Sequence, residues 1–202
     1  MPNWCATEIN IYSSDRQKLE VLNKLIEEWT SKDFVENGFG HNWLGNVVGF
    51  SGIAGWDKEK DDFNKNIRCR GCLSGIYLYG DHLQVYTETA WAPMMQMWEL
   101  ICDKYLPDHE IMFTAEECGC GIYETNDPDV EGTYYLDIWD PPEEVKDEES
   151  VYEADEDYII DFCQRFLGTE IDDLDKLLQM VKDSAIGFAI HKWEHCDIAD
   201  CY

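Results

Sequence analysis

The stretch that decides the fold is residues 5–29, CATEINIYSSDRQKLEVLNKLIEEW. Its first part alternates polar with apolar side chains, as in Glu-Ile-Asn-Ile at residues 8–11, and this period of two predicts a half-buried strand. Its second part carries large apolar side chains at helical spacing, so a helix that ends near Ser31 should follow the strand. These side chains are Leu19, Leu22, Ile26 and Trp29, with Val21 and Leu25 beside them.

The junction between this strand and this helix carries a signal of its own. Residues 14–17, Ser-Asp-Arg-Gln, fit a capping box, in which the side chains of Ser14 and Gln17 satisfy free backbone amides at the helix start. We therefore expect Ser14 to cap the helix.

Strands and helices continue to alternate as far as residue 115. A hairpin is predicted for residues 74–79 and 82–89, because the Gly80-Asp81 pair between them suits a tight turn. Pro93 fits the first turn of a second helix, where its missing N–H costs nothing. This helix has one apolar face and leads to a strand at residues 110–115.

The predicted order is strand, helix, two strands, helix, strand, which is the order of a ferredoxin-like (βαββαβ) α+β domain. In such a domain, both helices cover one face of an antiparallel sheet. Residues 122–125 and 133–139 are predicted to form an extra hairpin, since turn residues lie between them at 126–129. The glycine-rich stretch 33–68 is expected to hold only a short buried helix or a turn near residues 43–50.

The composition of the chain changes at Asp140. From Asp140 to Asp183 there are 16 acidic and four basic residues, a surplus typical of a solvated surface. Inside this stretch an apolar stripe ends at Gly168, which suits a helix C-terminus, and Thr169 can cap a second helix. We therefore expect a ferredoxin-like domain at residues 1–140, followed at 141–202 by an acidic linker and a helical hairpin packed on the same core.

The charge of the whole chain limits its partners. Its 202 residues include 43 acidic and 15 basic ones, a formal net charge of −28. A surface of this sign repels nucleic-acid phosphates and anionic membranes. The start of the chain lacks a basic leader with an apolar stretch behind it, and no apolar run approaches the roughly 20 residues that cross a bilayer. We therefore expect a cytoplasmic protein that contacts neither nucleic acid nor membrane directly.

Nine cysteines raise the question of a metal site. Cys69 and Cys72, together with Cys118 and Cys120, would supply four thiolates to a structural zinc ion if the fold brought them together. Both pairs border predicted strands, where positions three apart lie on opposite faces. Reduced thiols are the simpler interpretation in a chain without an export signal.

The second candidate metal site combines His191 and His195 with Cys196 and Cys201. On a helix, histidines four residues apart share a face. However, Glu194 stands directly before His195, so the order differs from the H-E-x-x-H motif of metalloproteases. Neither candidate is specific enough to assign, and we expect no metal, cofactor or catalytic residue.

The sequence offers no catalytic motif. Nothing local to Cys5 supplies the cation or the helix N-terminus that activates a thiolate. Glu116 and Glu117 are adjacent on a predicted strand, so they should point to opposite faces rather than act as a pair. The remaining candidates are scattered histidines at positions 41, 82 and 109.

Two tryptophans near the second predicted helix have different expectations. Trp98 lies on the apolar face of the helix, so it should be in the core. Trp91 stands just before the helix, where either the core or a stacking platform for a base or sugar suits it.

The first 140 residues carry several short motifs. PNWC stands at residues 2–5, ahead of a strand, and TAWAP at residues 89–93, at a strand-to-helix junction. CRG stands at residues 69–71, and EECGC at residues 116–120 leads to TND at 125–127. These motifs resemble those of the YubB-type ferredoxin-like proteins, which occur on phages, plasmids and bacterial genomes. The resemblance implies the fold and a mobile-element setting, and it implies no activity.

These observations favour a non-catalytic binding or accessory protein of mobile-element type, whose acidic surface meets a protein with a basic surface. One alternative is a DNA mimic, in which acids spaced like phosphates block a nucleic-acid-binding protein. The other is an enzyme of unknown class, which would need a pocket that gathers a histidine, a thiol and an acid. The sequence leaves the partner and the oligomeric state open.

Overall fold

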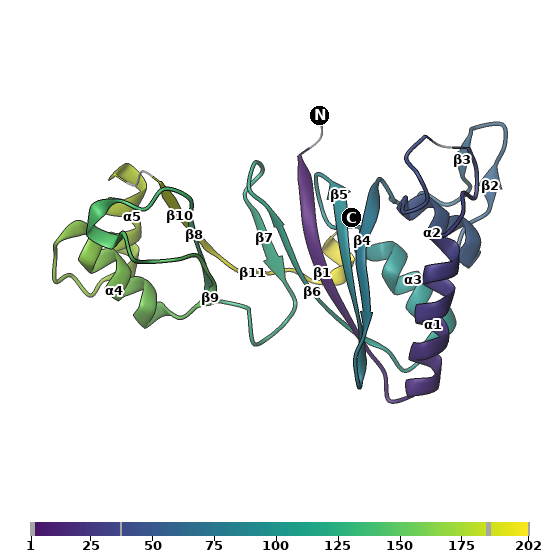
Figure 1. Cartoon of the computed structure of the whole chain (residues 1–202), viewed down its shortest axis with the longest axis horizontal. Helices are drawn as coiled ribbons and strands as arrows, with labels where there is room; N and C mark the ends of the chain where they lie inside the picture. The colour runs from purple at the N-terminus through teal and green to yellow at the C-terminus, as the bar shows by residue number, and fades with distance from the viewer. Residues whose placement is uncertain (1–2, 37, 185–186, 202) are drawn as a thin grey trace. The chain divides into compact units, whose positions relative to one another are not determined.

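The computed structural model of the chain describes residues 3–36, 38–184 and 187–201. These residues form an α+β fold with five α-helices and eleven β-strands (Figure 1). The chain divides into two compact units, which we call the first unit (Met1–Asp127 with Cys196–Tyr202) and the second unit (Pro128–His195). Within the described residues, every helix is too short or too polar to cross a membrane.

The largest sheet has six strands in the order β11-β7-β6-β1-β5-β4. Strand β1 pairs antiparallel with both β5 and β6, and the outer pairs β5–β4 and β6–β7 are also antiparallel. The strands of the first unit are β1 (Trp4–Tyr12), β2 (Trp56–Asp57), β3 (Asp62–Phe63), β4 (Gly71–Leu78), β5 (His82–Ala90), β6 (Glu110–Glu117) and β7 (Ile122–Thr125). The hairpin predicted around Gly80-Asp81 is therefore confirmed as β4 and β5.

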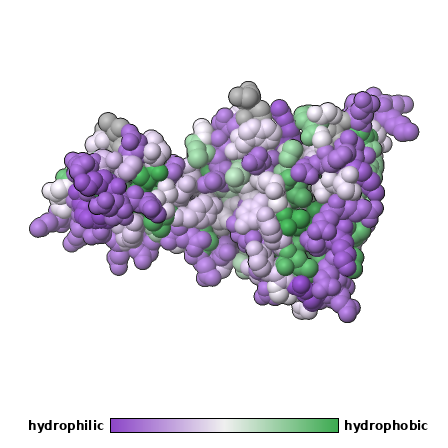
Figure 2. Space-filling model, viewed as in Figure 1, coloured by the Kyte–Doolittle hydropathy of each residue, from purple (hydrophilic) through white to green (hydrophobic). Residues whose placement is uncertain are grey.

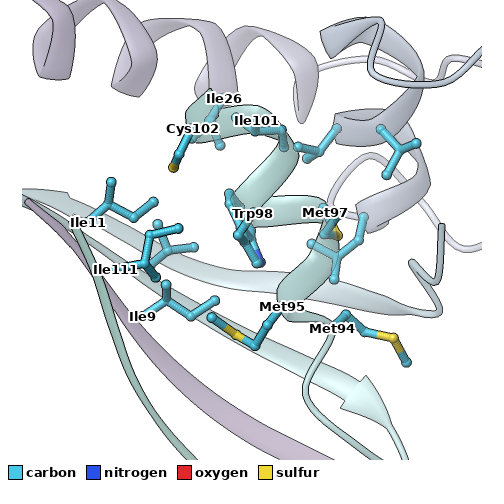
Figure 3. Close-up of a cluster of buried hydrophobic side chains, with 14 of the residues drawn as sticks. Ile9, Ile11, Ile26, Met94, Met95, Met97, Trp98, Ile101, Cys102 and Ile111 are labelled. Carbon is cyan, nitrogen blue, oxygen red and sulfur yellow. The ribbon is translucent and has the colours of Figure 1, made fainter. Parts of the chain in front are cut away.

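Helices α1 (Arg16–Trp29) and α3 (Met95–Tyr105) lie against the same face of this sheet, with the short helix α2 (Leu44–Ser51) beside them (Figure 1). The alternating pattern of β1 turns Ile9 and Ile11 into the core, where they face Trp98 of α3 (Figure 3). Trp98 is only 1% exposed, which confirms its expected place in the core. One apolar layer between the helices and the sheet therefore holds the first unit together.

The cap of α1 is one residue later than predicted. The Asp15 carboxylate, not the Ser14 hydroxyl, accepts hydrogen bonds from the backbone amides of Gln17 and Lys18. The Ser14 hydroxyl instead donates to the Asp108 carboxylate at 2.7 Å. A carboxylate is the stronger acceptor at the positive end of a helix, which explains why Asp15 takes this position.

The second unit has a sheet and a core of its own. Strand β8 lies between β10 and β9, and both pairs are antiparallel. Helices α4 and α5 pack on this sheet through a separate apolar cluster that includes Phe162 and Leu177. The elements of this unit are β8 (Tyr134–Ile138), η1 (Glu143–Val145), β9 (Val151–Ala154), α4 (Glu156–Leu167), α5 (Leu174–Ser184), β10 (Phe188–Lys192) and β11 (Glu194–His195). The short helix η2 (Ile198–Asp200) belongs to the last segment of the first unit.

The hairpin predicted for this region was wrong. Residues 122–125 and 133–139 do not form a hairpin, because β7 pairs with β6 and β8 pairs with β9 and β10. The tight turn after β6, where Gly121 has φ +71°, returns the chain directly beside β6. The expected boundary at residue 140 falls inside the second unit, between β8 and η1.

Two helices, α4 and α5, lie where the sequence predicts them, but they pack on a core of their own rather than on that of the first unit. Helix α4 ends at Gly168, which adopts the left-handed conformation of a C-cap. At the next helix, the Asp173 carboxylate accepts a hydrogen bond from the Lys176 amide, whereas Thr169 lies five residues before the helix. The composition change at Asp140 therefore marks a loop within a unit rather than a domain boundary.

Candidate functional site

The most distinctive chemical feature of the molecule is the charge of the second unit. Its 68 residues include 20 acidic and five basic ones, a formal net charge of −15. The first unit is about twice as long and carries 23 acidic and ten basic residues, a formal net charge of −13. The density of negative charge is therefore more than twice as high in the second unit.

The elements of the second unit direct these carboxylates into solvent. Helix α4 buries Ile159, Phe162 and Cys163 along one stripe, so its acidic residues lie on the other faces. Hydrophilic residues cover most of the face of the α4–α5 region that is visible in Figure 2. From η1 to the start of α4, exposed acids follow one another closely, and they include Glu144, Asp147, Glu149 and Glu153.

The few basic side chains neutralise only a small part of this surface. Arg165 contacts both Glu148 and Asp161, and Lys146 contacts Glu143. A hydrogen bond from the Tyr158 hydroxyl, together with Arg165, holds the pKa of Glu148 below its ordinary value. Because acids outnumber bases four to one in this unit, most of its carboxylates face water rather than an internal cation.

Such an arrangement favours electrostatic binding. A dense set of exposed carboxylates attracts cationic surfaces and accelerates their encounter with the unit. The attraction acts over about 8–10 Å at physiological salt and weakens as salt is added. We therefore treat the acidic surface, defined as the carboxylates of residues 140–175, as the candidate functional site.

The motif residues of the first unit converge at one end of its sheet. Trp4 of β1 pairs with Ala90 of β5, and the Trp91 amide donates to the Asn3 carbonyl at 3.0 Å. On the other side of β5, Gly71 pairs with Thr89. Three of the sequence motifs, around residues 3–5, 69–71 and 89–93, are therefore neighbours in space, whereas Pro2 lies outside the described residues.

Trp91 is exposed and has an unusual backbone. Its side chain is 48% exposed, and its φ of +76° is rare for a residue with a bulky side chain. Trp4, on the adjacent strand, is 50% exposed. The structure thus places Trp91 outside the core.

The four cysteines of the first candidate zinc site do not come together. Cys72 lies on β4 and Cys69 just before it, whereas Cys118 and Cys120 lie in the turn after β6. Strands β5 and β1 separate β4 from β6, a distance of three strand spacings, or about 14 Å. Burial raises the pKa of Cys69 to about 12, so its thiol stays protonated at neutral pH.

The turn after β6 has its own local support. The Glu117 carboxylate accepts hydrogen bonds from the amides of Gly119 and Cys120. Hydrogen bonds from the Cys120 side chain and from these amides hold the pKa of Glu117 below its ordinary value. Glu116 occupies the neighbouring position of β6, on the opposite face, so the two glutamates do not form an acid–base pair.

The second candidate metal site is divided by the structure. His191 lies on strand β10 beside Tyr135. The Nδ1 atom of His195 forms a 3.0 Å hydrogen bond with a carboxylate oxygen of Glu131. The helix that would place both histidines on one face is absent from residues 187–195, since they form strands. Cys196 and Cys201 do come together, with their sulfur atoms 2.7 Å apart.

A third residue joins these two cysteines. One donor atom each from Glu124, Cys196 and Cys201 lies within 4.8 Å of the other two. Burial raises the pKa of the Cys196 thiol and of the Cys201 thiol above the ordinary value of a cysteine, and the Glu124 carboxylate adds to this effect. Glu124 was missed by sequence reasoning because it is 72 positions from Cys196 and belongs to no motif.

The other catalytic candidates also lie apart. Cys5 is buried, and burial raises the pKa of its thiol to about 11, the opposite of what a nucleophile requires. The three scattered histidines each contact local groups: His41 contacts Asp33, His82 contacts Asp81, and His109 contacts the Leu106 carbonyl.

Comparison with known proteins adds no further assignment. The sequence matches no protein-family model, and no match to it is found among curated proteins or solved structures. The charge distribution and the geometry described above are therefore the basis for the proposals that follow.

Proposed function

We propose that this chain is a non-catalytic binding protein whose acidic surface docks on a basic surface of another protein. The observation that carries the proposal is the excess of 20 acidic over five basic residues in a 68-residue unit that has its own apolar core. A folded core fixes the positions of the carboxylates, so they present a defined pattern rather than the diffuse charge of a flexible tail. Electrostatic complementarity of this kind sets the association rate and the choice of partner.

We further infer that the first unit is a ferredoxin-like domain related to the YubB-type proteins of mobile elements. Its support is the strand order β6-β1-β5-β4 with antiparallel neighbours, and the placement of α1 after β1 and of α3 after β5. The proximity of the motifs at residues 3–5, 69–71 and 89–93 supports the same relation. In this proposal, the first unit is the scaffold and α4 and α5 form an acidic helical hairpin.

The proposal is tested by removing charge from one unit at a time. The second-unit variant carries Glu144→Gln, Asp147→Asn, Glu149→Gln and Glu153→Gln, all at exposed positions. The matched first-unit variant carries Glu27→Gln, Glu36→Gln, Glu59→Gln and Glu110→Gln, which are also exposed. Each variant loses four negative charges and keeps the core of its unit.

The measurement is quantitative capture of proteins from a cell lysate on each immobilised chain at low and high salt. We expect captured proteins to be basic, to be released by salt, and to bind the second-unit variant about tenfold or more weakly, since each exposed charge contact contributes up to about 1 kcal/mol. Binding to the first-unit variant should change little. Equal loss in both variants, or basic partners retained by the second-unit variant, would contradict the proposal.

The identity of the captured protein decides the form of the function. A partner that normally binds DNA, and that DNA displaces from the chain, would make the acidic surface a DNA mimic. A basic partner without affinity for DNA would make the chain an adaptor for that protein.

A further inference from the structure

The side chains of Glu124, Cys196 and Cys201 form a compact cluster, which we call the thiol cluster, at the β7 edge of the first unit. Their donor atoms lie within 4.8 Å of one another, and the two sulfur atoms are 2.7 Å apart. Cys201 is 4% exposed, whereas Cys196 and Glu124 are half-buried. Two sulfur atoms and a carboxylate oxygen are therefore held together in a partly dry environment.

The fold builds this cluster from two distant segments. Glu124 lies opposite Ala115 of β6, and this small neighbour leaves room on the core side of the sheet. The Cys196 amide donates to the Thr125 carbonyl at 2.9 Å, which fixes the last segment of the chain beside β7. The short helix η2 then turns the chain so that Cys201 returns to its partner cysteine.

We propose that Glu124, Cys196 and Cys201 bind one divalent zinc ion. Thiolate and carboxylate oxygen are both established zinc ligands, and sulfur ligands favour zinc over hard ions such as magnesium and calcium. A set of three protein ligands leaves the fourth position for water or a small ligand, as in open zinc sites. This proposal is independent of the acidic surface, because it concerns the first unit alone.

The binding step balances in charge and protons. Both thiols give up their protons, so one Zn²⁺ and the neutral dithiol with its carboxylate yield a complex of charge −1 and two released protons. Two thiolates on a tetrahedral zinc ion lie about 3.7 Å apart, given Zn–S bonds of about 2.3 Å. The sulfur atoms must therefore separate by about 1 Å on binding, and Cys196 is the less enclosed of the two residues.

A pocket adjoins Cys201, the most enclosed of the three proposed ligands. It has a volume of about 160 Å³ and is lined by Asn66, Arg68, Met94, Gln96 and Cys201. The pocket therefore reaches the cluster at Cys201.

The experiment uses the full chain, purified without a histidine tag, reduced and freed of metal with a chelator. Zn²⁺ binding is measured by equilibrium dialysis with metal analysis, and Co²⁺ is the spectroscopic probe because its sulfur charge-transfer band reports thiolate ligation. We expect one ion per wild-type chain and two protons released per ion near pH 7, read with a pH indicator in weak buffer.

The variants separate this site from the other cysteines. Cys196→Ser and Cys201→Ser should lose stoichiometric binding and the charge-transfer band, and Glu124→Gln should weaken binding at least tenfold. The matched control Cys118→Ser, at an exposed cysteine outside the cluster, should bind like wild type. Wild-type protein that binds no Zn²⁺ after reduction, or equal binding by Cys196→Ser and Cys118→Ser, would overturn the proposal. A Cys196–Cys201 disulfide as the only state of the pair would also overturn it. The number of protons released by the wild-type chain tests the site even if a serine variant misfolds.

Discussion

The two units of this chain reach stability in different ways. The first unit covers one sheet with three helices and buries large side chains such as Trp98 and Phe113. The second unit has a smaller apolar cluster and a formal net charge of −15 in half the length. A small domain buries a smaller share of its surface, and like charges repel one another, so the second unit should have the narrower margin of stability.

This difference indicates which changes should affect the stability of each unit. Packing decides the stability of the first unit, so changes of core volume should dominate there. Charge, salt and pH should matter more in the second unit, where carboxylates crowd on a small scaffold. The following predictions test this comparison from the largest expected effect to the smallest.

Replacing Trp98 by Ala should have the largest effect. The side chain is fully buried between α3 and the sheet, so its loss removes apolar contacts and leaves a cavity that costs about 3–5 kcal/mol. Segment-resolved hydrogen exchange should show the loss of protection in β1, β5 and α3. Protection lost first in α4 and α5 would contradict the assignment of Trp98 to a separate core.

Leu177→Ala probes the core of the second unit. Leu177 is fully buried in α5, and its truncation should cost about 2–5 kcal/mol. Because the second unit has less stability to lose, we expect this change to unfold α4 and α5 at room temperature. Circular dichroism and hydrogen exchange provide the measurement, and native protection in both helices would show that the second unit has a wider margin than we infer.

Added salt should stabilise the second unit more than the first. Raising NaCl from low to high concentration screens repulsion among exposed carboxylates, and we expect a gain on the order of 1 kcal/mol in the second unit. Urea unfolding, which adds no ions, is followed by exchange in α4 and in α1 for comparison. An equal gain of stability in α4 and α1 would contradict the proposed difference between the two units.

Replacing Glu148 should have the smallest effect on stability, and this effect should depend on pH. Its pKa is held below the ordinary value by the Tyr158 hydroxyl and by Arg165, so its contribution is fully present above the pKa of the unfolded state, about 4.3. The contribution is lost as pH falls through the lower pKa of the folded state. Glu148→Gln should cost about 0.5–1 kcal/mol near pH 7, since Arg165 is partly exposed, and the difference from wild type should vanish at acidic pH.

A matched control keeps this test specific. Glu144→Gln removes the same charge from an exposed position in the same unit and should cost nothing or stabilise slightly. A loss of stability in both variants would show that the Tyr158–Glu148–Arg165 contacts are not its cause.

Much of the first unit follows from local sequence patterns. The alternation at residues 8–11 and the helical spacing from Leu19 to Trp29 are strong signals, because each segment has one side toward the core. The cap moved from Ser14 to Asp15 because both residues are good caps, and sequence alone does not rank adjacent candidates.

The second unit was predicted less well for a physical reason. Residues 122–125 and 133–139 are both strands, as expected, but which strands pair depends on contacts with β6 and β10 that are distant in the sequence. The same limit applies to the thiol cluster, where Cys196 and Cys201 are near in sequence and Glu124 is not. Local patterns therefore predict the strands and helices, whereas the way in which the strands pair depends on contacts between distant segments.

The most direct test of the central claim is to map where a captured basic partner touches this chain. A carbodiimide joins carboxylates to lysines in contact, and mass spectrometry identifies the carboxylates involved. With 23 acidic residues in the first unit and 20 in the second, unspecific contact would give links in roughly that proportion. We predict that the links concentrate on residues 140–175, and links spread evenly over both units, or concentrated on the first, would contradict the proposed docking surface.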